Sequence, residues 1–261
     1  MTAPVPPSDA GPTGPHEVAV WLLSLRDHAA AAARAAHLLD AEEARRSAEF
    51  RDEAARARYV TSHVGLRVLL AAHTGTAPGN VEFTRERCGM PDCELPHGRP
   101  ALAARPDVHF SLSHAGDTAL FALASEPVGA DIESEELVRD GLARAGRRLH
   151  PDERRALAEV PAARRGAAVL GCLVRKEAYL KGTGAGLAAG LGTHHVGLAE
   201  EFAPTWAPPG PAGWSLADVP APDGYRAAVA VQHRTARGES AAKGAGAGAP
   251  TVLRIEQLRL G

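Results

Sequence analysis

The amino-acid sequence predicts an α+β fold of two lobes, each a small sheet packed with helices, with a cleft between them. The chain has 261 residues, which is enough to bury a full core. Apolar residues follow strand spacing in some stretches and helix spacing in others. The order of the elements (one strand, then helices, then three strands) occurs twice, over about 110 residues each time. The two halves share this order without strong sequence identity, which indicates a pseudo-duplicated architecture.

Residues 16–126 are predicted to form the N-terminal lobe, after a disordered stretch over residues 1–15 that is rich in Pro, Gly, Ser and Thr. Apolar residues recur at helical spacing within residues 52–73, and the glycine-containing stretch 75–79 ends this helix. A loop containing Pro, Gly and Cys is expected from Cys88 to Pro106. The elements expected in this lobe are a strand at Val18–Leu25, helices at Leu38–Phe50 and Asp52–His73, and strands at Val81–Arg85, Val108–Ser113 and Thr118–Ala124.

Residues 127–235 are predicted to form the C-terminal lobe, followed by a linker-like tail over residues 236–261. Within that tail, residues 236–250 have linker composition, whereas Thr251–Leu260 is amphipathic and can dock back onto the fold at a place that the sequence does not indicate. The elements expected in this lobe are a strand at Val128–Glu133, helices at Leu137–Arg148, Pro151–Val160 and Gly166–Lys181, and strands at His195–Ala199, Trp214–Leu216 and Tyr225–Gln232.

Composition and charge exclude several classes of protein. Lys and Arg number 29 against 31 Asp and Glu, so the chain lacks the basic excess of a general nucleic-acid binder. Three cysteines are too few for a disulfide scaffold and fit a reducing compartment. The first residues do not resemble a signal peptide, and no stretch reaches the roughly 18 apolar residues of a membrane span. We therefore expect a cytoplasmic protein.

The strand Val128–Glu133 carries two acids on one face. Side chains alternate along a strand, so Asp131 and Glu133 share a face while Ala130 and Ile132 share the other. Two neighbouring carboxylates repel each other unless a cation lies between them, and oxygen ligands at this spacing suit Mg²⁺. The alternative is an exposed strand end with two solvated acids.

The helix Gly166–Lys181 carries Glu177 and Lys181 four residues apart, on the same face. A surface salt bridge is the ordinary explanation of such a pair. However, Leu170, Leu173 and Val174 lie on the same stripe, so the pair continues the apolar face toward the interior. Charges that point inward need partners, which the strand carboxylates and a metal ion would supply.

Two further segments suggest familiar motifs but lack the context that those motifs require. The run Gly182–Leu187 closes a helix, whereas a nucleotide-binding glycine loop opens one, so a helix stop followed by a mobile loop is favoured. Ser113 and His114 are adjacent at a strand end, but no Gly-x-Ser-x-Gly nucleophile elbow exists in the sequence. His114 is better placed to donate a hydrogen bond to a phosphate at a turn.

Basic residues and a cysteine-containing loop in the first half allow further hypotheses. One or two of the arginines are expected to reach a phosphate while the others are solvated; the candidates are Arg46, Arg51, Arg56, Arg58 and Arg99. Cys88, Cys93 and His97 lie close in sequence, but a zinc ribbon needs tighter cysteine pairs and a fourth ligand. Free thiols are expected there, with structural zinc as the alternative.

Taken together, these segments resemble the Sfp-type 4′-phosphopantetheinyl transferases. That family has a Val-Gly-x-Asp-x-Glu strand and, some 40 residues later, a helix reading Trp-Ser/Thr-x-Lys-Glu-Ala/Ser-x-x-Lys. The resemblance spans residues 38–187 and rests on five ordered segments: Arg58, Gly98-Arg99-Pro100, Phe110–His114, Val128–Glu133 and Leu173–Lys181. One departure is that Leu173 and Val174 stand where the family has Trp-Ser/Thr, which affects local packing rather than metal chemistry.

The resemblance implies transfer of the phosphopantetheine arm of coenzyme A to a serine of an acyl or peptidyl carrier protein, with release of adenosine 3′,5′-bisphosphate. It implies a Mg²⁺ ion, or Mn²⁺ in its place, held by Asp131, Glu133 and Glu177. Glu177 would also act as general base, and Lys181 would stabilise the leaving phosphate. The residues expected at the nucleotide phosphates are Arg46, Arg58, Arg99, Ser113 and His114.

Two competing functions are a non-enzymatic module that binds carrier proteins and a hydrolase of pyrophosphates resembling coenzyme A. A degenerate binding module should have lost an acidic position or the lysine, yet all four are present. A hydrolase usually has a denser acidic motif such as the Nudix box, which the sequence lacks. We expect a monomer whose carrier docks beside Gly182–Leu191, with no nucleic-acid or membrane partner.

Overall fold

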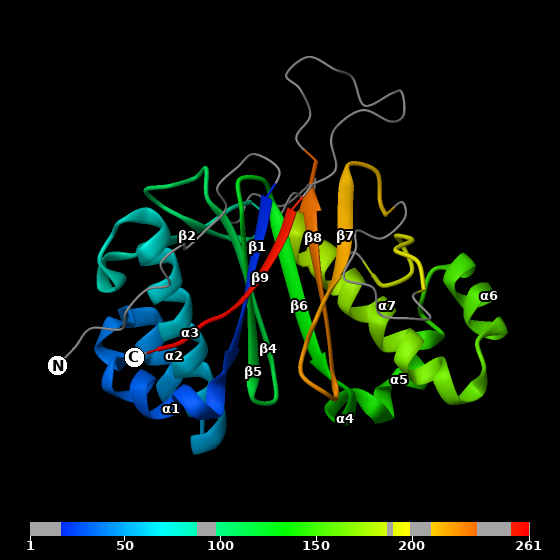
Figure 1. Cartoon of the computed structure of the whole chain (residues 1–261), viewed down its shortest axis with the longest axis horizontal. Coiled ribbons are helices and arrows are strands. Elements are labelled where there is room, and N and C mark those ends of the chain that lie inside the picture. The colour runs from blue at the N-terminus through cyan, green and yellow to red at the C-terminus, as the bar shows by residue number, and fades with distance from the viewer. Residues whose placement is uncertain (1–16, 88–97, 187–189, 199–209, 234–251, 261) are drawn as a thin grey trace, which may run out of the picture.

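The computed structural model describes residues 17–87, 98–186, 190–198, 210–233 and 252–260. It consists of four layers, helix, sheet, sheet and helix (Figure 1). The α+β class expected from the sequence is confirmed. The first sheet has the order β4-β5-β1-β9 and the second has the order β6-β8-β7. Their strands are β1 (Glu17–Ser24), β4 (His109–Ala115), β5 (Thr118–Ala124), β9 (Val252–Gln257), β6 (Val128–Ser134), β7 (Trp214–Val219) and β8 (Tyr225–Gln232).

Helices cover the outer face of each sheet. In the first half they are α1 (Leu25–Arg34), η1 (Ala36–Leu38), α2 (Ala41–Ala48), α3 (Glu53–Thr74) and η2 (Pro78–Asn80). A short hairpin of β2 (Phe83–Arg85) and β3 (Pro100–Leu102) follows. In the second half the helices are α4 (Glu135–Val138), η3 (Arg139–Gly141), α5 (Leu142–Gly146), α6 (Pro151–Glu159) and α7 (Ala162–Thr183). No helix in the described ranges is long and apolar enough to cross a membrane.

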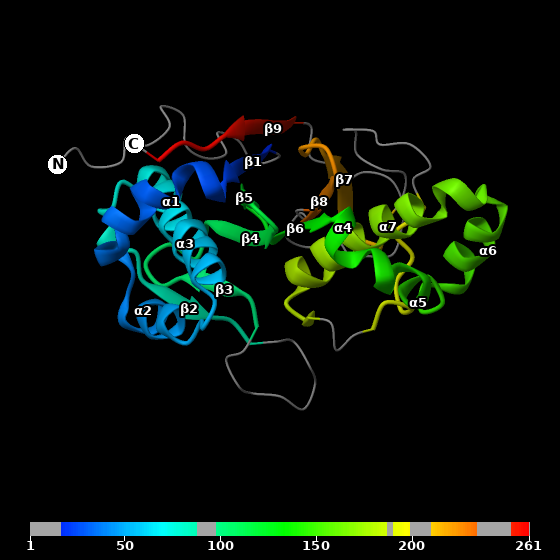
Figure 2. The same ribbon diagram turned by 90° about the horizontal axis from the view of Figure 1, so that it is seen from below.

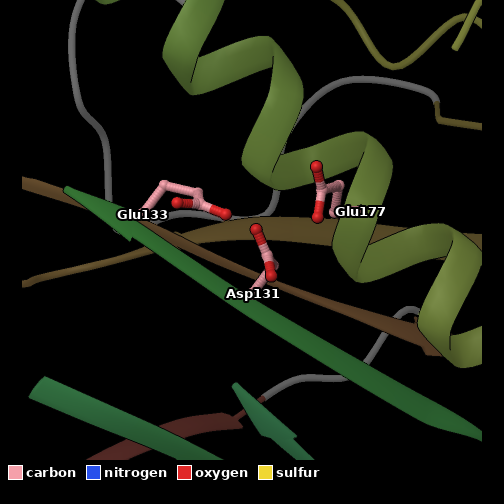
Figure 3. A group of neighbouring side chains, drawn as sticks. All are labelled: Asp131, Glu133 and Glu177. Carbon is pink, nitrogen blue, oxygen red and sulfur yellow. The ribbon is translucent and has the colours of Figure 1, made fainter. Parts of the chain in front are cut away.

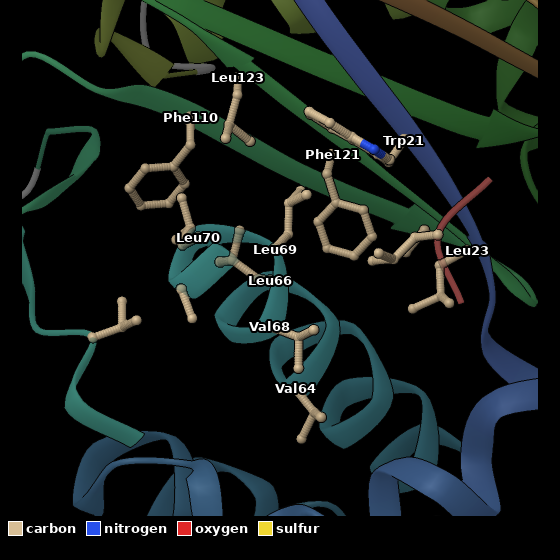
Figure 4. Packing of buried hydrophobic residues seen from close by; sticks show 14 of the residues in the cluster. Trp21, Leu23, Val64, Leu66, Val68, Leu69, Leu70, Phe110, Phe121 and Leu123 are labelled. Atoms are coloured by element: carbon tan, nitrogen blue, oxygen red, sulfur yellow. The ribbon is translucent and has the colours of Figure 1, made fainter. Parts of the chain in front are cut away.

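The first core fills the space between α3 and the four-stranded sheet. Trp21 and Phe121 of the sheet pack with Leu66 and Leu69 of the helix (Figure 4). The alternate residues of the same strands face the second sheet and form a second core with it. Because both faces of the first sheet are covered, β5 is buried at all seven positions and reads as an almost continuous apolar run.

A buried arginine ties α2 to α3. Asp40 caps α2 in a capping box with Glu43. The same two carboxylates bind Arg67 of α3, whose Nε lies 2.6 Å from Glu43 Oε2 and whose Nη2 lies 2.6 Å from Asp40 Oδ2. The side chain of Arg67 is fully buried, so these pairings compensate a charge that would otherwise be costly. The position of α2 relative to α3 is fixed in this way.

The C-terminal segment joins the sheet of the first half. Strand β9 pairs in parallel with β1, and the two lie side by side in Figures 1 and 2. Glu256 Oε2 accepts a hydrogen bond from Trp21 Nε1, and Leu258 and Leu260 are buried in the first core. The amphipathic end of the chain therefore belongs to the packed fold, at a place that the sequence did not indicate.

Several sequence-based expectations about elements need correction. Residues 25–34, in which only the end of a strand at Leu25 was expected, form α1, which Ser24 caps and which buries Ala32. Residues 195–198 are not a strand, because the backbone N–H of Val196 donates to the Glu153 carboxylate instead of a neighbouring strand. The single helix expected at Leu137–Arg148 is broken into α4, η3 and α5.

Other expectations differ less or lie outside the described residues. Strand β3 lies within the stretch expected to be a loop from Cys88 to Pro106. Residues 1–15, expected to be disordered, and residues 236–250, expected to be a linker, lie outside the described ranges. Gly75 ends α3 as expected, with a φ of 71° that glycine adopts without strain.

Helix α7 lies directly against β6. A Cβ atom on Gly129 would lie 2.0 Å from the carbonyl oxygen of Ala178 and 2.3 Å from the backbone nitrogen of Gly182. No side chain fits between two backbones this close. The glycine in β6 therefore sets the distance between the strand and the helix, and with it the distance between the polar side chains that each presents to the other.

We predict that Gly129→Ala pushes α7 away from β6 and lowers the free energy of unfolding by about 3 kcal/mol or more. Gly171→Ala is the matched control. Gly171 lies in α7, and a Cβ atom there would meet no neighbouring atom within 4 Å. This substitution is expected to stabilise the protein by roughly 0.5–1 kcal/mol through helix propensity. Urea unfolding of both variants measures this difference. Equal stability of the two variants would contradict the close approach.

Candidate functional site

The polar residues of β6 point toward α7. Val128, Ala130 and Ile132 lie in the core between the sheets. Because side chains alternate along the strand, Asp131 and Glu133 project from the opposite face, on which Gly129 touches the helix. The strand therefore presents two carboxylates to the one surface of α7 that approaches most closely.

Glu177 of α7 completes a group of three carboxylates. Asp131, Glu133 and Glu177 each offer an oxygen, and these three oxygens all lie within 4.8 Å of one another. Figure 3 shows the three side chains converging between strand and helix. Asp131 is almost completely buried at 1 % exposure, whereas the two glutamates are half-buried. Such an arrangement is unfavourable for three negative charges without a compensating cation.

The acidities of the two glutamates reflect this environment. Burial, and then the charge of Asp131, raises the pKa of Glu133 to about 7, and Lys181 opposes the shift. Burial raises the pKa of Glu177 to about 7 as well, with Asp131 and then Glu133 adding to the effect. The pKa of Asp131 is also raised by burial, although Lys181 and Ser113 lower it. Near neutral pH the two glutamates therefore exchange between their protonated and ionised forms.

Asp131 has one oxygen paired and one oxygen free. Its Oδ1 accepts hydrogen bonds from Lys181 Nζ at 2.6 Å and from Ser113 Oγ at 2.9 Å. Its Oδ2 is buried and has no hydrogen-bond partner among the described residues. A buried carboxylate oxygen without a partner is costly unless a ligand binds it. Three carboxylates with such an orphaned oxygen form an oxygen-only donor set, which fits Mg²⁺.

Lys181 and Ser113 form a small network around Asp131. Lys181 Nζ also donates to Ser113 Oγ at 2.8 Å, and the lysine side chain is 37 % exposed. Ser113 is buried, and its hydroxyl group is directed at Asp131 and Lys181 by these hydrogen bonds. The structure thus brings the lysine and the serine to the carboxylates. Their predicted contacts with the phosphates of a substrate stay predictions.

A cavity of about 870 Å³ lies beside this network and is lined by residues from both halves of the chain. Of the predicted phosphate contacts, Arg46, Arg99 and Lys181 line it. Arg46 is bound to Glu49 at 2.7 Å, and Arg99 is bound to Glu86 at 2.6 Å. Substrate phosphates would have to compete with these carboxylates or use the remaining N–H groups of the two arginines.

Sequence reasoning missed several residues of the cavity wall. Arg45, Tyr59, His63 and Arg85 line the cavity. The rings of Tyr59 and His63 stack with centroids 3.9 Å apart, and burial lowers the pKa of His63 to about 4. Their spacing of four residues on a predicted helix was the available signal. It did not distinguish a cavity wall from an ordinary helix surface.

Arg58 and His114, two other predicted phosphate contacts, lie near the network but outside the cavity wall. Arg58 Nε donates to Asp117 Oδ1 at 3.0 Å. Partial burial lowers the pKa of His114, and the positive charges of Lys181 and Arg58 lower it further. The imidazole is therefore neutral at pH 7 and can donate one hydrogen bond. Cys88, Cys93 and His97 lie outside the described residues.

Leu173 and Val174, which stand where the family has Trp-Ser/Thr, both pack in an apolar core. Val174 is buried in the core beneath α7, and Leu173 packs against that core. Two residues upstream of Glu177, Arg175 binds Asp218 of β7 through two hydrogen bonds of 2.6–2.7 Å. Lys176 lies 2.7 Å from Glu153 in a second buried pair. These contacts fix the rotation of α7 about its axis.

Comparison with known proteins identifies relatives of this chain. Residues 127–230 match the 4′-phosphopantetheinyl transferase superfamily. The 4′-phosphopantetheinyl transferase psf-1 of Bacillus pumilus is 38 % identical over 105 residues, 40 % of this chain and 44 % of the relative. A putative 4′-phosphopantetheinyl transferase of Synechocystis sp. is 29 % identical over 59 % of this chain and 60 % of its own length. The 4′-phosphopantetheinyl transferase HetI of Nostoc sp. is 29 % identical over 82 % and 87 %.

These matches confirm the resemblance to 4′-phosphopantetheinyl transferases that the motifs indicated. The family match covers β6, α7, β7 and most of β8, and so includes the three carboxylates. The chain spans about half the length of the first two relatives it matches, at 44 % and 60 %.

We predict that Mg²⁺ stabilises the protein more at pH 8 than at pH 5.5. With folded pKa values of about 7, Glu133 and Glu177 are protonated at the lower pH and cannot bind a cation well. The ordinary pKa of a glutamate is 4.5, and both pKa values are raised in the folded protein. Without a cation, the raised pKa values therefore stabilise the folded protein fully below pH 4.5, and this stabilisation is lost as the pH rises through about 7. Scanning calorimetry of chelator-treated protein, with and without Mg²⁺, measures the shift in Tm at each pH.

The control variants for this prediction are Glu177→Gln and Glu136→Gln. The first removes one carboxylate of the cluster and is expected to lose most of the Mg²⁺-dependent shift. The second removes an exposed glutamate of α4 and is expected to keep the shift. A shift in Tm that is independent of pH, or that survives in Glu177→Gln, would show that Mg²⁺ binds elsewhere.

Proposed function

We propose that this protein transfers the 4′-phosphopantetheine group of coenzyme A to a serine of an apo acyl or peptidyl carrier protein, with release of adenosine 3′,5′-bisphosphate. The reaction is Mg²⁺-dependent, and the carriers are those of polyketide, nonribosomal peptide or fatty acid synthesis. The observation that carries the proposal is the cluster of Asp131, Glu133 and Glu177 beside a cavity lined by basic side chains. Relatives named 4′-phosphopantetheinyl transferases support it.

The two-lobe, pseudo-duplicated architecture is part of the proposal. Each half has a long helix of 22 residues, α3 or α7, on the outer face of its sheet. The two sheets pack against each other, and the cavity is lined by residues from α2, α3 and the β2–β3 hairpin as well as from the end of α7. These observations support a substrate cleft between the lobes, to which each lobe would supply a different part of the site.

Asp131, Glu133 and Glu177 would hold Mg²⁺, or Mn²⁺ in its place. The orphaned Asp131 Oδ2 is the buried ligand, and the two half-buried glutamates complete the set. When bound, the cation would neutralise charge on the pyrophosphate of coenzyme A. Lys181 keeps the other oxygen of Asp131 paired, so that Oδ2 is left for the ligand. The carboxylate cluster therefore defines where the pyrophosphate binds.

Glu177 is the proposed general base for the serine hydroxyl group of the carrier. Its pKa of about 7 means that it can accept a proton at neutral pH, directly or through a water molecule. It projects from α7, whose last turns border the cavity through Leu180 and Lys181. Lys181, partly exposed at this border, is placed to stabilise the leaving phosphate. No nucleophilic side chain is needed.

Basic residues bind the nucleotide phosphates in this proposal. Arg46 and Arg99 do so from the cavity wall, and Arg58 and His114 from outside it, near Lys181. Ser113 contributes its hydroxyl group through the network with Lys181. The carrier docks beside residues 182–191, of which Gly184 and Gly186 line the cavity and 187–189 lie outside the described residues. We further propose a cytoplasmic monomer without nucleic-acid or membrane partners, acting in secondary metabolism.

The direct test is to incubate the protein with coenzyme A, Mg²⁺ and a panel of apo carrier proteins, and to measure the mass of each carrier. Attachment of phosphopantetheine to the carrier serine, together with stoichiometric adenosine 3′,5′-bisphosphate, is the expected result. Cleavage of coenzyme A with products only in solution would indicate a hydrolase. Binding of carriers without any product would indicate a non-enzymatic module.

We predict that Asp131→Ala lowers kcat by roughly a hundredfold or more, because even changes outside the ligand set of a metal cost 10–100-fold. Glu177→Gln is expected to be worse than Glu133→Ala, since it removes a ligand and the base together. Lys181→Ala should lower kcat more than it changes the Mg²⁺ dependence. Carrier mass measured against Mg²⁺ and Mn²⁺ concentration tests the series, with Glu136→Gln as control. Near-normal activity of Asp131→Ala without added metal would rule out this mechanism.

We predict that Arg58→Ala and Arg99→Ala each raise the KM for coenzyme A by about tenfold, through loss of a charged hydrogen bond to the ribose 3′-phosphate. The KM for dephospho-coenzyme A should rise less, because that substrate lacks the 3′-phosphate. Arg105→Ala is the control, since Arg105 pairs with Asp107 and does not line the cavity. Equal losses with both substrates would remove the 3′-phosphate assignment.

A further inference from the structure

The turn between β4 and β5 is held from the opposite half of the molecule. The backbone N–H of Asp117 in this turn donates to Tyr225 Oη at 3.2 Å. A Cβ atom on Gly116 would lie 2.5 Å from the same oxygen, so the tyrosine is seated directly against the turn. Tyr225 begins β8 and lies opposite Ser134 of β6, one residue after Glu133. The turn is thereby fixed relative to the strand that carries the carboxylates.

The side chain of Asp117 holds two arginines from two different helices. Its Oδ1 accepts a hydrogen bond from Arg58 Nε of α3 at 3.0 Å, and its Oδ2 accepts one from Arg26 of α1. The Asp117 side chain is 27 % exposed, against 38 % for Arg58 and 79 % for Arg26. The less exposed carboxylate is therefore the fixed point of the group, and it orients the two longer side chains.

Arg58 keeps its two terminal nitrogens available. Asp117 takes only Nε, and Nη1 and Nη2 make no hydrogen bond within the part of the chain that the structure describes. The terminal edge of a guanidinium group matches a phosphate through two parallel hydrogen bonds. His114, on the strand that leads into the turn, lies close enough to Arg58 and Lys181 for both charges to act on it. Several donors to an anion thus surround the turn.

We propose that Asp117 is a positioning residue, which orients Arg58 and Arg26 as a paired binding site for a phosphate of coenzyme A. The inference rests on the function proposed above and adds Arg26 to its phosphate contacts. The Tyr225 contact fixes the distance from this pair of arginines to the carboxylate cluster. Coenzyme A would therefore bind at two sites a fixed distance apart, with one phosphate at the arginines and the pyrophosphate at the carboxylate cluster.

The opposite role for Asp117 makes a distinct prediction. If its carboxylate merely competed with a phosphate for the arginines, removing its charge would tighten binding. If it orients the arginines, removing its charge weakens binding, because Arg58 loses the contact that fixes its rotamer. The sign of the effect of Asp117→Asn on binding therefore distinguishes the two roles.

The test measures binding of adenosine 3′,5′-bisphosphate by calorimetry and the kinetics of carrier modification, for Asp117→Asn and for the matched control Asp107→Asn. Asp107 also pairs with an arginine in the same half, Arg105, at 2.7 Å, and neither residue lines the cavity. We expect Asp117→Asn to weaken binding of the bisphosphate and raise the KM for coenzyme A by roughly fivefold, with little change in kcat. Asp107→Asn should leave both unchanged.

The same substitution in an Arg58→Ala background separates positioning from a general structural role. If Asp117 acts through Arg58, Asp117→Asn adds little to the loss caused by Arg58→Ala. Tighter binding by Asp117→Asn, or a loss that adds in full to that of Arg58→Ala, would overturn the inference. These outcomes are judged with a wild-type protein that modifies carriers. A wild-type protein that neither binds the bisphosphate nor modifies any carrier would overturn the proposed function, and this inference with it.

Discussion

The close approach of α7 to β6 at Gly129 is the constraint on which the site depends. A methyl group at this position would lie 2.0 Å from the backbone of the helix, so only glycine, which has no side chain, fits there. At this distance Glu177 and Lys181 of the helix meet Asp131 and Glu133 of the strand directly. The glycine in the Val-Gly-x-Asp-x-Glu motif is thus a packing requirement for the carboxylate cluster that follows it.

The carboxylate cluster differs from the other buried charges of the molecule. Arg67 is compensated by two carboxylates, Arg175 by both oxygens of Asp218, and Lys176 by Glu153. In the cluster, three carboxylates share the single positive charge of Lys181, one oxygen of Asp131 has no partner among the described residues, and the pKa values of both glutamates are raised to about 7. The positive charge that the cluster lacks is what a bound cation would supply.

Periodicity predicted most of the fold and the central part of the site. The alternation in β6 placed Asp131 and Glu133 on one face, and the apolar stripe of α7 placed Glu177 and Lys181 toward the interior, because both patterns are local. The pairing of β9 with β1 was not predictable, since an edge strand is decided by tertiary packing across more than 200 residues of chain. Asp117 was missed for the same reason: its partners come from α1, α3 and β8.

The most direct test of the central claim is a crystal structure with Mn²⁺ recorded at a wavelength where the ion scatters anomalously. We expect one anomalous peak within about 2.0–2.4 Å of Asp131 Oδ2 and of an oxygen of each glutamate, with Lys181 still bound to Oδ1. Crystals of Glu177→Gln grown and measured in the same way should show a weaker peak or none. A full-strength peak away from the three carboxylates, or none in the wild-type protein at millimolar Mn²⁺, would contradict the account.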